Sequence, residues 1–243
     1  MNAATYSKDF TDVFSFANNQ AALCDLKSAS VGVYSEQRFL LQETSVYSLA
    51  FALPTVAGGF GFGANYFGYS DYNESQLGIA YGKRLGKMVD IGVQFNYYNI
   101  RIAGYGSTSA VNFEMGAMFH LTEKLHFGIH LYNPVGGKFG KSTNEKLASI
   151  FTVGVGYDAS KQVFISAEIV KEENKVVNVN AGLQYMFAKQ FFVRGGIETQ
   201  LSSPYAGVGF LLNAFRIDIA VNYHPQLGFT PGLLLIYQFN KKE

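Results

Sequence analysis

Large apolar side chains alternate with small or polar ones most regularly in the stretch Ile91-Gly92-Val93-Gln94-Phe95-Asn96-Tyr97. In an extended strand successive side chains point to opposite faces, so the aliphatic and aromatic members share one face, and the glycine and the amides share the other. The pattern recurs in residues 177–185 and 215–223, the latter with Arg216 and Asp218 on the polar face. One face therefore suits lipid and the other a polar lumen.

Similar stretches, separated by turns, fill the chain from Ala29 to Phe239. Tight connections alternate with longer ones, and short turns face the periplasm in barrels of this kind. The last stretch ends on Tyr237 and Phe239, an aromatic end that outer-membrane barrels commonly place on their closing strand. The sequence predicts an all-β protein, an antiparallel up-and-down transmembrane β-barrel of about 14 strands. The predicted strands lie near residues 29–40, 44–53, 58–69, 75–84, 89–99, 108–120, 125–133, 148–157, 162–171, 175–187, 190–200, 205–212, 215–224 and 231–239.

Composition agrees with a barrel and excludes several other classes. Aromatic residues make up 16% of the 243-residue chain, with 22 Phe, 16 Tyr and no Trp, and charged residues make up only 15%. The formal net charge of +1 gives no electrostatic basis for binding nucleic acid. No run approaches the roughly 18 apolar residues of a membrane helix. A soluble carbohydrate-binding β protein is disfavoured, because the outward apolar faces would aggregate in water.

Motifs for catalysis are missing from the sequence, so we expect a protein that is not an enzyme and has no cofactor. There is no Gly-x-Ser-x-Gly elbow, and the glycines of 58–63 lie on an alternating strand without the Lys-Ser/Thr helix of a phosphate loop. His120, His126 and His130 suggest a metal site, because all three fall on inward faces of neighbouring strands. We favour ordinary polar lumen positions, since no carboxylate or cysteine completes a ligand spacing in the sequence.

Charged residues on predicted inward faces form a candidate lumen lining or pathway. An unpaired charge in a narrow barrel costs several kcal/mol, so we expect these side chains to pair and fill the lumen; a water-filled polar path is the alternative. The charged residues on these predicted inward faces are Glu114, Glu168, Arg194, Glu198, Arg216 and Asp218.

Residues 2–28 do not alternate, and 9–17 could form a turn or two of helix. The segment Asn18-Asn19-Gln20-Ala21-Ala22-Leu23, followed by about fourteen strands and by His130-Leu131-Tyr132-Asn133-Pro134, resembles the FadL-like outer-membrane barrels, most of all their PorV/PorQ branch. The resemblance implies that residues 1–28 are a hatch inside the lumen, held by Asn18, Asn19, Gln20 and Leu23. It implies a barrel over 29–239 and a short periplasmic tail at 240–243. Asn19-Gln20 stands where that family usually has Asn-Pro, so a long-chain fatty-acid site is not implied.

The resemblance also implies a location in the outer membrane of a Gram-negative bacterium, in contact with lipid. Residues 1–6 lack the basic and apolar parts of a signal peptide, so we expect one to have been removed. Because the loops are short, the preferred hypothesis is an accessory subunit that docks other outer-membrane or secreted proteins. The expected partner-contact loop, 134–146, carries Lys138, Lys141, Glu145 and Lys146. The alternative is a FadL-like passive channel for small hydrophobic molecules.

Overall fold

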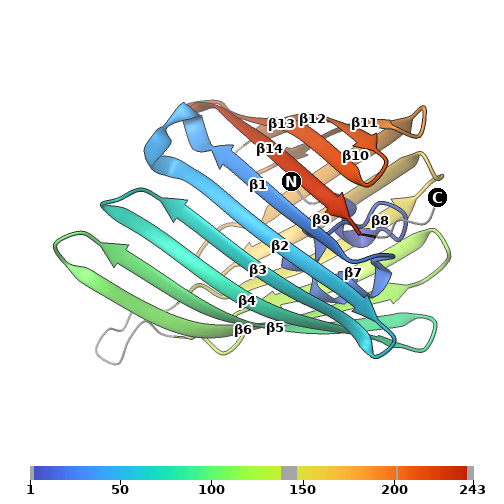
Figure 1. Cartoon of the computed structure of the whole chain (residues 1–243), viewed down its shortest axis with the longest axis horizontal. Helices are drawn as coiled ribbons and strands as arrows, with labels where there is room; N and C mark the ends of the chain where they lie inside the picture. Colours follow the sequence, from blue (N-terminus) through green and yellow to red (C-terminus); the bar gives the residue numbers. More distant parts are fainter. Residues whose placement is uncertain (1–2, 138–146, 201, 240–243) are drawn as a thin grey trace.

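A computed structural model describes residues 3–137, 147–200 and 202–239. Within these ranges, fourteen strands form a closed antiparallel barrel in which each strand pairs with its neighbours in sequence (Figure 1). The strands are β1 (Ser30–Gln37), β2 (Ser45–Thr55), β3 (Gly58–Gly68), β4 (Tyr72–Leu85), β5 (Val89–Ile102), β6 (Gly106–His120), β7 (Leu125–Tyr132), β8 (Ile150–Asp158), β9 (Val163–Glu172), β10 (Asn178–Phe187), β11 (Phe191–Glu198), β12 (Ser203–Leu212), β13 (Phe215–His224) and β14 (Gly228–Gln238). The predicted fold class is confirmed.

Closure comes from the pairing of the first and last strands. β1 and β14 pair antiparallel from Ser30 opposite Gln238 to Glu36 opposite Gly232, so the sheet has no free edge. Without an edge, the backbone groups of the wall find partners within the sheet, as the hydrocarbon core of a bilayer requires. Within the described residues, no helix is both long and apolar enough to cross a bilayer.

The strand ends differ from the sequence-based prediction by a few residues, mostly on the side of the longer loops. β5 ends at Ile102 and β6 begins at Gly106, so only a short turn remains where the predicted strands 89–99 and 108–120 left a longer connection. β14 begins at Gly228, three residues before the predicted start at Pro231. Hydrogen-bonded pairing with the neighbouring strand continues through these residues although their alternation is weak, which local sequence cannot reveal.

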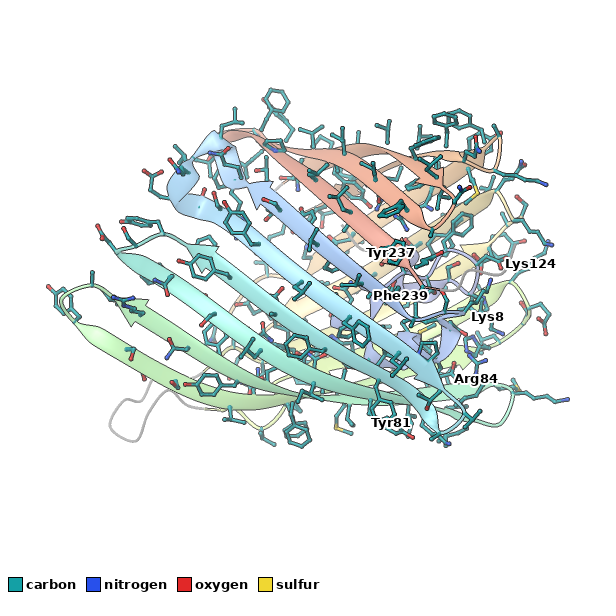
Figure 2. All side chains as sticks on the ribbon, in the orientation of Figure 1. Lys8, Tyr81, Arg84, Lys124, Tyr237 and Phe239 are labelled. Carbon is teal, nitrogen blue, oxygen red and sulfur yellow. The ribbon has the colours of Figure 1, made fainter. Side chains whose placement is uncertain are left out.

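Most outward side chains are large and apolar, and near the short turns they form an aromatic belt. The Phe187 and Phe191 rings lie 5.5 Å apart, and Phe191 lies 4.7 Å from Phe210. Farther round the wall, Tyr237 lies 4.9 Å from Phe239, and both lie near the end of the barrel where Figure 2 shows Lys8 and Lys124. Such girdles mark the membrane–water interface of outer-membrane barrels.

The N-terminal segment lies inside the barrel, at the end with the short turns (Figure 1). It forms three short 3₁₀ turns: η1 (Ala3–Tyr6), η2 (Ser15–Ala17) and η3 (Gln20–Asp25). The helical turn expected within 9–17 is limited to η2, and η3 was not expected. The Asn19 side chain accepts a hydrogen bond from the Ala21 N–H and so caps the start of η3. The outer loop that follows β1 carries η4 (Arg38–Leu40) and η5 (Gln42–Thr44).

Adjacent residues of β10 provide a test of the lipid and lumen faces. Val179 faces outward, so Val179→Arg should destabilise the inserted barrel by about 2–4 kcal/mol. Asn180 lies opposite both Glu168 and Glu198, so Asn180→Arg would gain carboxylate partners and should cost less than about 1 kcal/mol. Urea titration in liposomes measures both free energies.

Equal costs at the two positions would contradict the assignment of faces. From the sequence pattern alone, Asn96→Arg is predicted to cost as little stability as Asn180→Arg, because both residues face the lumen. In the structure Asn96 is buried and its amide donates to Glu114 at 2.6 Å, so an arginine would not fit there and the control is restricted to Asn180.

Candidate functional site

The N-terminal segment is fastened to the barrel wall by two buried amides, Asn19 and Gln20. The Asn19 side-chain NH₂ donates to the backbone carbonyls of Ala117 on β6, at 3.2 Å, and Ile129 on β7, at 3.1 Å. The Gln20 side-chain NH₂ donates to the Glu114 carboxylate at 2.8 Å. Because both amides are fully buried, these bonds fix the position of the segment in the lumen.

Glycines on the inner wall make room for this segment. A Cβ atom at Gly59 would lie 2.6 Å from the Leu23 carbonyl oxygen, and one at Gly128 would lie 2.6 Å from the Tyr6 ring. Gly92 and Gly116 are obstructed in the same way by Gln20 and Asn19. Since no side chain fits between wall and segment, we call residues 3–25 the hatch. In the alternating stretch 58–63, Gly59 and Gly61 face the hatch, where an added Cβ atom would meet Leu23 and Phe16.

On the opposite wall the first hatch turn is held by two carboxylates. The Tyr6 hydroxyl donates to Glu168 at 3.1 Å, and the Ser7 hydroxyl donates to Asp158 at 2.6 Å. The Tyr6 ring packs with Phe10 and Phe164 in a buried cluster. Burial, with the negative charge of Glu168 added, raises the pKa of Tyr6 well above its usual range, so the phenol is a neutral donor.

Glu114 is the centre of a second polar network, between the hatch and the wall. Its carboxylate accepts from Asn96 at 2.6 Å and from Gln20, and it lies 2.9 Å from the His130 Nε2. Glu114 is 2% exposed, so these partners compensate a charge that has almost no contact with solvent. The carboxylate predicted to line the lumen thus joins the hatch to β5, β6 and β7.

Three further predicted lumen charges form one buried cluster. Arg194 on β11 and Arg216 on β13 both donate to the Asp218 carboxylate. The distance from the Arg216 guanidinium nitrogen to the Asp218 oxygen is 2.7 Å. The other guanidinium nitrogen of Arg216 lies 3.0 Å from Asp12 of the hatch. The Arg216 guanidinium also lies over the Phe192 ring, 4.6 Å from its centroid. Two carboxylates therefore balance two guanidinium groups, and one of the carboxylates belongs to the hatch.

The sequence missed Asp12, because a segment without alternation offers no face on which to place it. The structure brings the predicted residues Arg194, Arg216 and Asp218 together and places Glu114 separately. Of the remaining predicted hatch residues, Leu23 joins the hydrophobic core of hatch and wall, and the Asn18 amide donates to Thr5 within the hatch at 3.2 Å. The predicted partner-contact residues Lys138, Lys141, Glu145 and Lys146 lie outside the described residues, as does the tail at 240–243.

Above the hatch, toward the longer loops, the described residues line two neighbouring chambers. The first, of about 170 Å³, is polar: Glu168 and Glu198 face it, and the amides of Asn180 and Asn178 donate to them, both at 2.8 Å. The second, of about 290 Å³, has a mixed lining of Phe14, Val46 and Leu234 beside two arginines. Residues shared by both chambers are Tyr34, Glu36, Ala220 and Gly232.

The outer wall carries a hollow directly across the sheet from the second chamber. It has a volume of about 650 Å³ and spans β1 to β4 with the outward faces of β14. The outward residues Ser35, Ala64 and Ser75 are small where their neighbours Tyr47, Tyr66 and Leu77 are large, which leaves the depression. The linings of the hollow and the second chamber share Tyr34, Ser48 and Asn65, so a single layer of wall separates them.

Comparison with solved structures identifies this architecture. The CymD monoaromatic hydrocarbon channel is similar over 94% of this chain and 93% of its own, with a TM-score of 0.68 at 10% identity. The toluene transporter TbuX of Ralstonia pickettii is similar over 99% of this chain and 98% of its own, with a TM-score of 0.68 at 11% identity. A Pseudomonas aeruginosa FadL homologue is similar over 99% of this chain and 98% of its own, with a TM-score of 0.65 at 10% identity. The chain matches no protein-family model and no curated protein sequence.

These similarities show that the chain has the fold of FadL-like outer-membrane barrels, as the hatch motif predicted. At about 10% identity they show the fold alone. The neighbours are channels and transporters and not enzymes, in line with the predicted lack of enzymatic activity. The expected placement in the PorV/PorQ branch gains no support from them.

The buried arginine cluster predicts how strongly the hatch is attached. Asp12→Asn would leave Arg194 and Arg216 with Asp218 as their remaining carboxylate in the cluster. We expect a loss of about 3 kcal/mol from the free energy of unfolding, because an uncompensated buried charge is costly. Urea titration in liposomes gives the value.

Asp9→Asn is the matched control, since Asp9 is also a hatch aspartate paired with a basic residue. Its partner Lys27 is 75% exposed, so this substitution should cost less than about 1 kcal/mol. Similar losses for the two variants would show that burial of the Asp12 pair contributes nothing.

Proposed function

We propose that the protein is a passive outer-membrane channel for small hydrophobic molecules. The observation that carries the proposal is the second chamber, which opens above the hatch and is separated from a hollow in the outer wall by one layer of sheet. A molecule that enters from the loop side is stopped by the hatch. The thin wall beside the chamber offers it a route toward the membrane instead of straight through the barrel.

The size and lining of the second chamber suit a small apolar ligand. An enclosed apolar cavity of about 150 Å³ is enough to hold benzene, so about 290 Å³ accommodates a single-ring aromatic. Phe14, Val46 and Leu234 supply apolar contacts, and Tyr34 presents the face of a ring. The first chamber, with Glu168 and Glu198, is suited to water or to a polar substituent.

The structural neighbours support transport over the docking of partners. Their names describe a monoaromatic hydrocarbon channel and toluene transporters, and their fold matches over nearly the full length. The hypothesis of a partner-docking subunit depends mainly on the 134–146 loop, of which residues 138–146 lie outside the described residues. Purification from native membranes in mild detergent separates the two proposals, because docking requires a stoichiometric partner and transport does not.

Uptake across a lipopolysaccharide-bearing outer membrane tests the channel directly. Gram-negative cells that lack their own hydrocarbon channel should take up labelled toluene faster when they express this chain. Ala220→Phe should reduce uptake to the level of cells without the protein, because Ala220 lines both chambers and a ring there would fill the space.

Ala206→Phe is the matched control, because Ala206 lies on the adjacent strand and faces outward. It should fold and transport as the unaltered chain does. If the folded, unaltered chain raises uptake of no hydrophobic solute, the channel proposal is wrong. If Ala220→Phe transports normally, the chambers do not lie on the route.

Removal of the hatch should change ion conduction in planar bilayers. The full chain should be nearly silent, because Asn19, Gln20 and Tyr6 hold the hatch across the lumen. Deletion of residues 2–26 should produce stable conducting steps, provided that heat-modifiable migration shows the barrel to be folded. Unchanged conductance in a folded deletion variant would mean that the wall closes the lumen without the hatch.

A further inference from the structure

A second group of titratable residues lies at the hatch end of the barrel, outside the chambers. It joins Asp25 at the end of η3, Asp90 on β5 and His120 on β6. His120 Nε2 lies 2.9 Å from Asp90 Oδ2 and 4.0 Å from Asp25 Oδ2, and one ligand atom from each residue lies within 4.8 Å of the other two. The side chain of Asp25 is 4% exposed, that of Asp90 0% and that of His120 2%.

One oxygen of this group has no hydrogen-bond partner. Asp25 Oδ1 accepts from Arg84, which also donates to Asp90 at 2.8 Å. Asp25 Oδ2 is buried, is directed toward His120, and accepts no hydrogen bond from the described residues. A buried carboxylate oxygen without a partner is costly, so its position indicates a group that the protein atoms do not supply.

The orientation of the His120 ring leads to the same position. His120 Nδ1 lies 2.9 Å from His126 Nδ1, and His126 Nε2 lies 3.2 Å from Asp158 Oδ2. These contacts hold the ring so that its Nε2 lies 2.9 Å from the Asp90 oxygen and is directed toward the unpartnered Asp25 oxygen.

The charges of the cluster favour a bound cation. Asp25 and Asp90 face the guanidinium of Arg84, and Asp158 lies on the other side of His126. These three carboxylates outnumber the one guanidinium group, and a cation among them would offset the excess. The nearby Lys83 donates to the Ala57 carbonyl at 2.6 Å.

We propose that Asp25, Asp90 and His120 bind a divalent transition-metal ion of the Zn²⁺ type. Two carboxylates and one imidazole form a mixed oxygen and nitrogen set that suits Zn²⁺ better than Mg²⁺ or Ca²⁺, and a water molecule completes four-coordination. The supporting partners are in place, since Arg84 holds the carboxylates and His126 with Asp158 orients His120. The sequence-based expectation of no metal rested on local spacing, whereas the carboxylates of this proposed site come from distant segments.

The site is accessible from the short-turn end, and it joins hatch to wall. Arg84 is 44% exposed at that end (Figure 2), and Asp25 also borders a cavity of about 600 Å³ there. Asp25 belongs to the hatch and the other two ligands to the barrel. Bound metal would therefore hold the end of the hatch against β5 and β6, whatever molecule the channel transports.

Calorimetric titration of the full chain with Zn²⁺ tests the site. The protein is folded in detergent, treated with EDTA and titrated at neutral pH. We expect one Zn²⁺ ion per chain, a higher Tm with Zn²⁺, and no competition from Mg²⁺. Asp25→Asn and His120→Gln should each weaken Zn²⁺ binding at least about tenfold, since loss of even a residue that only supports a metal ligand has an effect of that size. His130→Gln is the matched control and should bind normally, because His130 is a buried histidine that contacts Glu114 instead.

Two results would overturn the proposal. If the unaltered chain binds no Zn²⁺ and its Tm does not change, a proton occupies the position; this measurement does not depend on any variant folding. If Asp25→Asn and His120→Gln bind Zn²⁺ as tightly as the unaltered chain does, the ion is held elsewhere. Heat-modifiable migration verifies that each variant is folded before it is titrated.

Discussion

The structure depends on the requirement that backbone N–H and C=O groups be paired inside a bilayer. The pairing of β1 with β14 meets this requirement by removing both free edges of the sheet. Closure then divides the side chains into two environments. Outward positions in the middle of the wall contact lipid, so most of them are aliphatic or aromatic, while the buried charged and amide side chains of the strands face the lumen and must find partners there.

The hatch supplies many of those partners. Asn19 and Gln20 bond to the wall on one side, and Tyr6 and Ser7 bond to it on the other. Glycines of the wall permit the close approach, and Asp12 completes the charge balance of the arginine cluster. Hatch and barrel are therefore interdependent: without the hatch, buried wall groups such as Glu114 and Arg216 would each lose a hydrogen-bonding or charged neighbour.

The same packing divides the lumen into zones with different chemistry. Toward the longer loops, chambers remain open and have polar and mixed linings. In the middle, hatch and wall make a dense core of Val13, Phe16 and Leu23 with small wall residues. At the short turns, buried carboxylates and histidines are concentrated near Arg84. A molecule in the chambers therefore meets a closed core toward the short turns, whereas at β1 to β3 a single layer of wall separates it from the outer surface.

The sequence by itself determined the barrel, the approximate strand positions and the inward or outward direction of side chains such as Phe95, Glu114 and Arg216. It could do so because alternation is a local property, set by the two-residue period of a strand and by the contrast between lipid and lumen. The tertiary structure alone decided which inward groups meet. Asp12 reaches Arg216, and Asp25 reaches Asp90 and His120, across large separations in the chain. These contacts depend on the path of a hatch without periodicity, and on the register that places its residues at particular heights in the lumen.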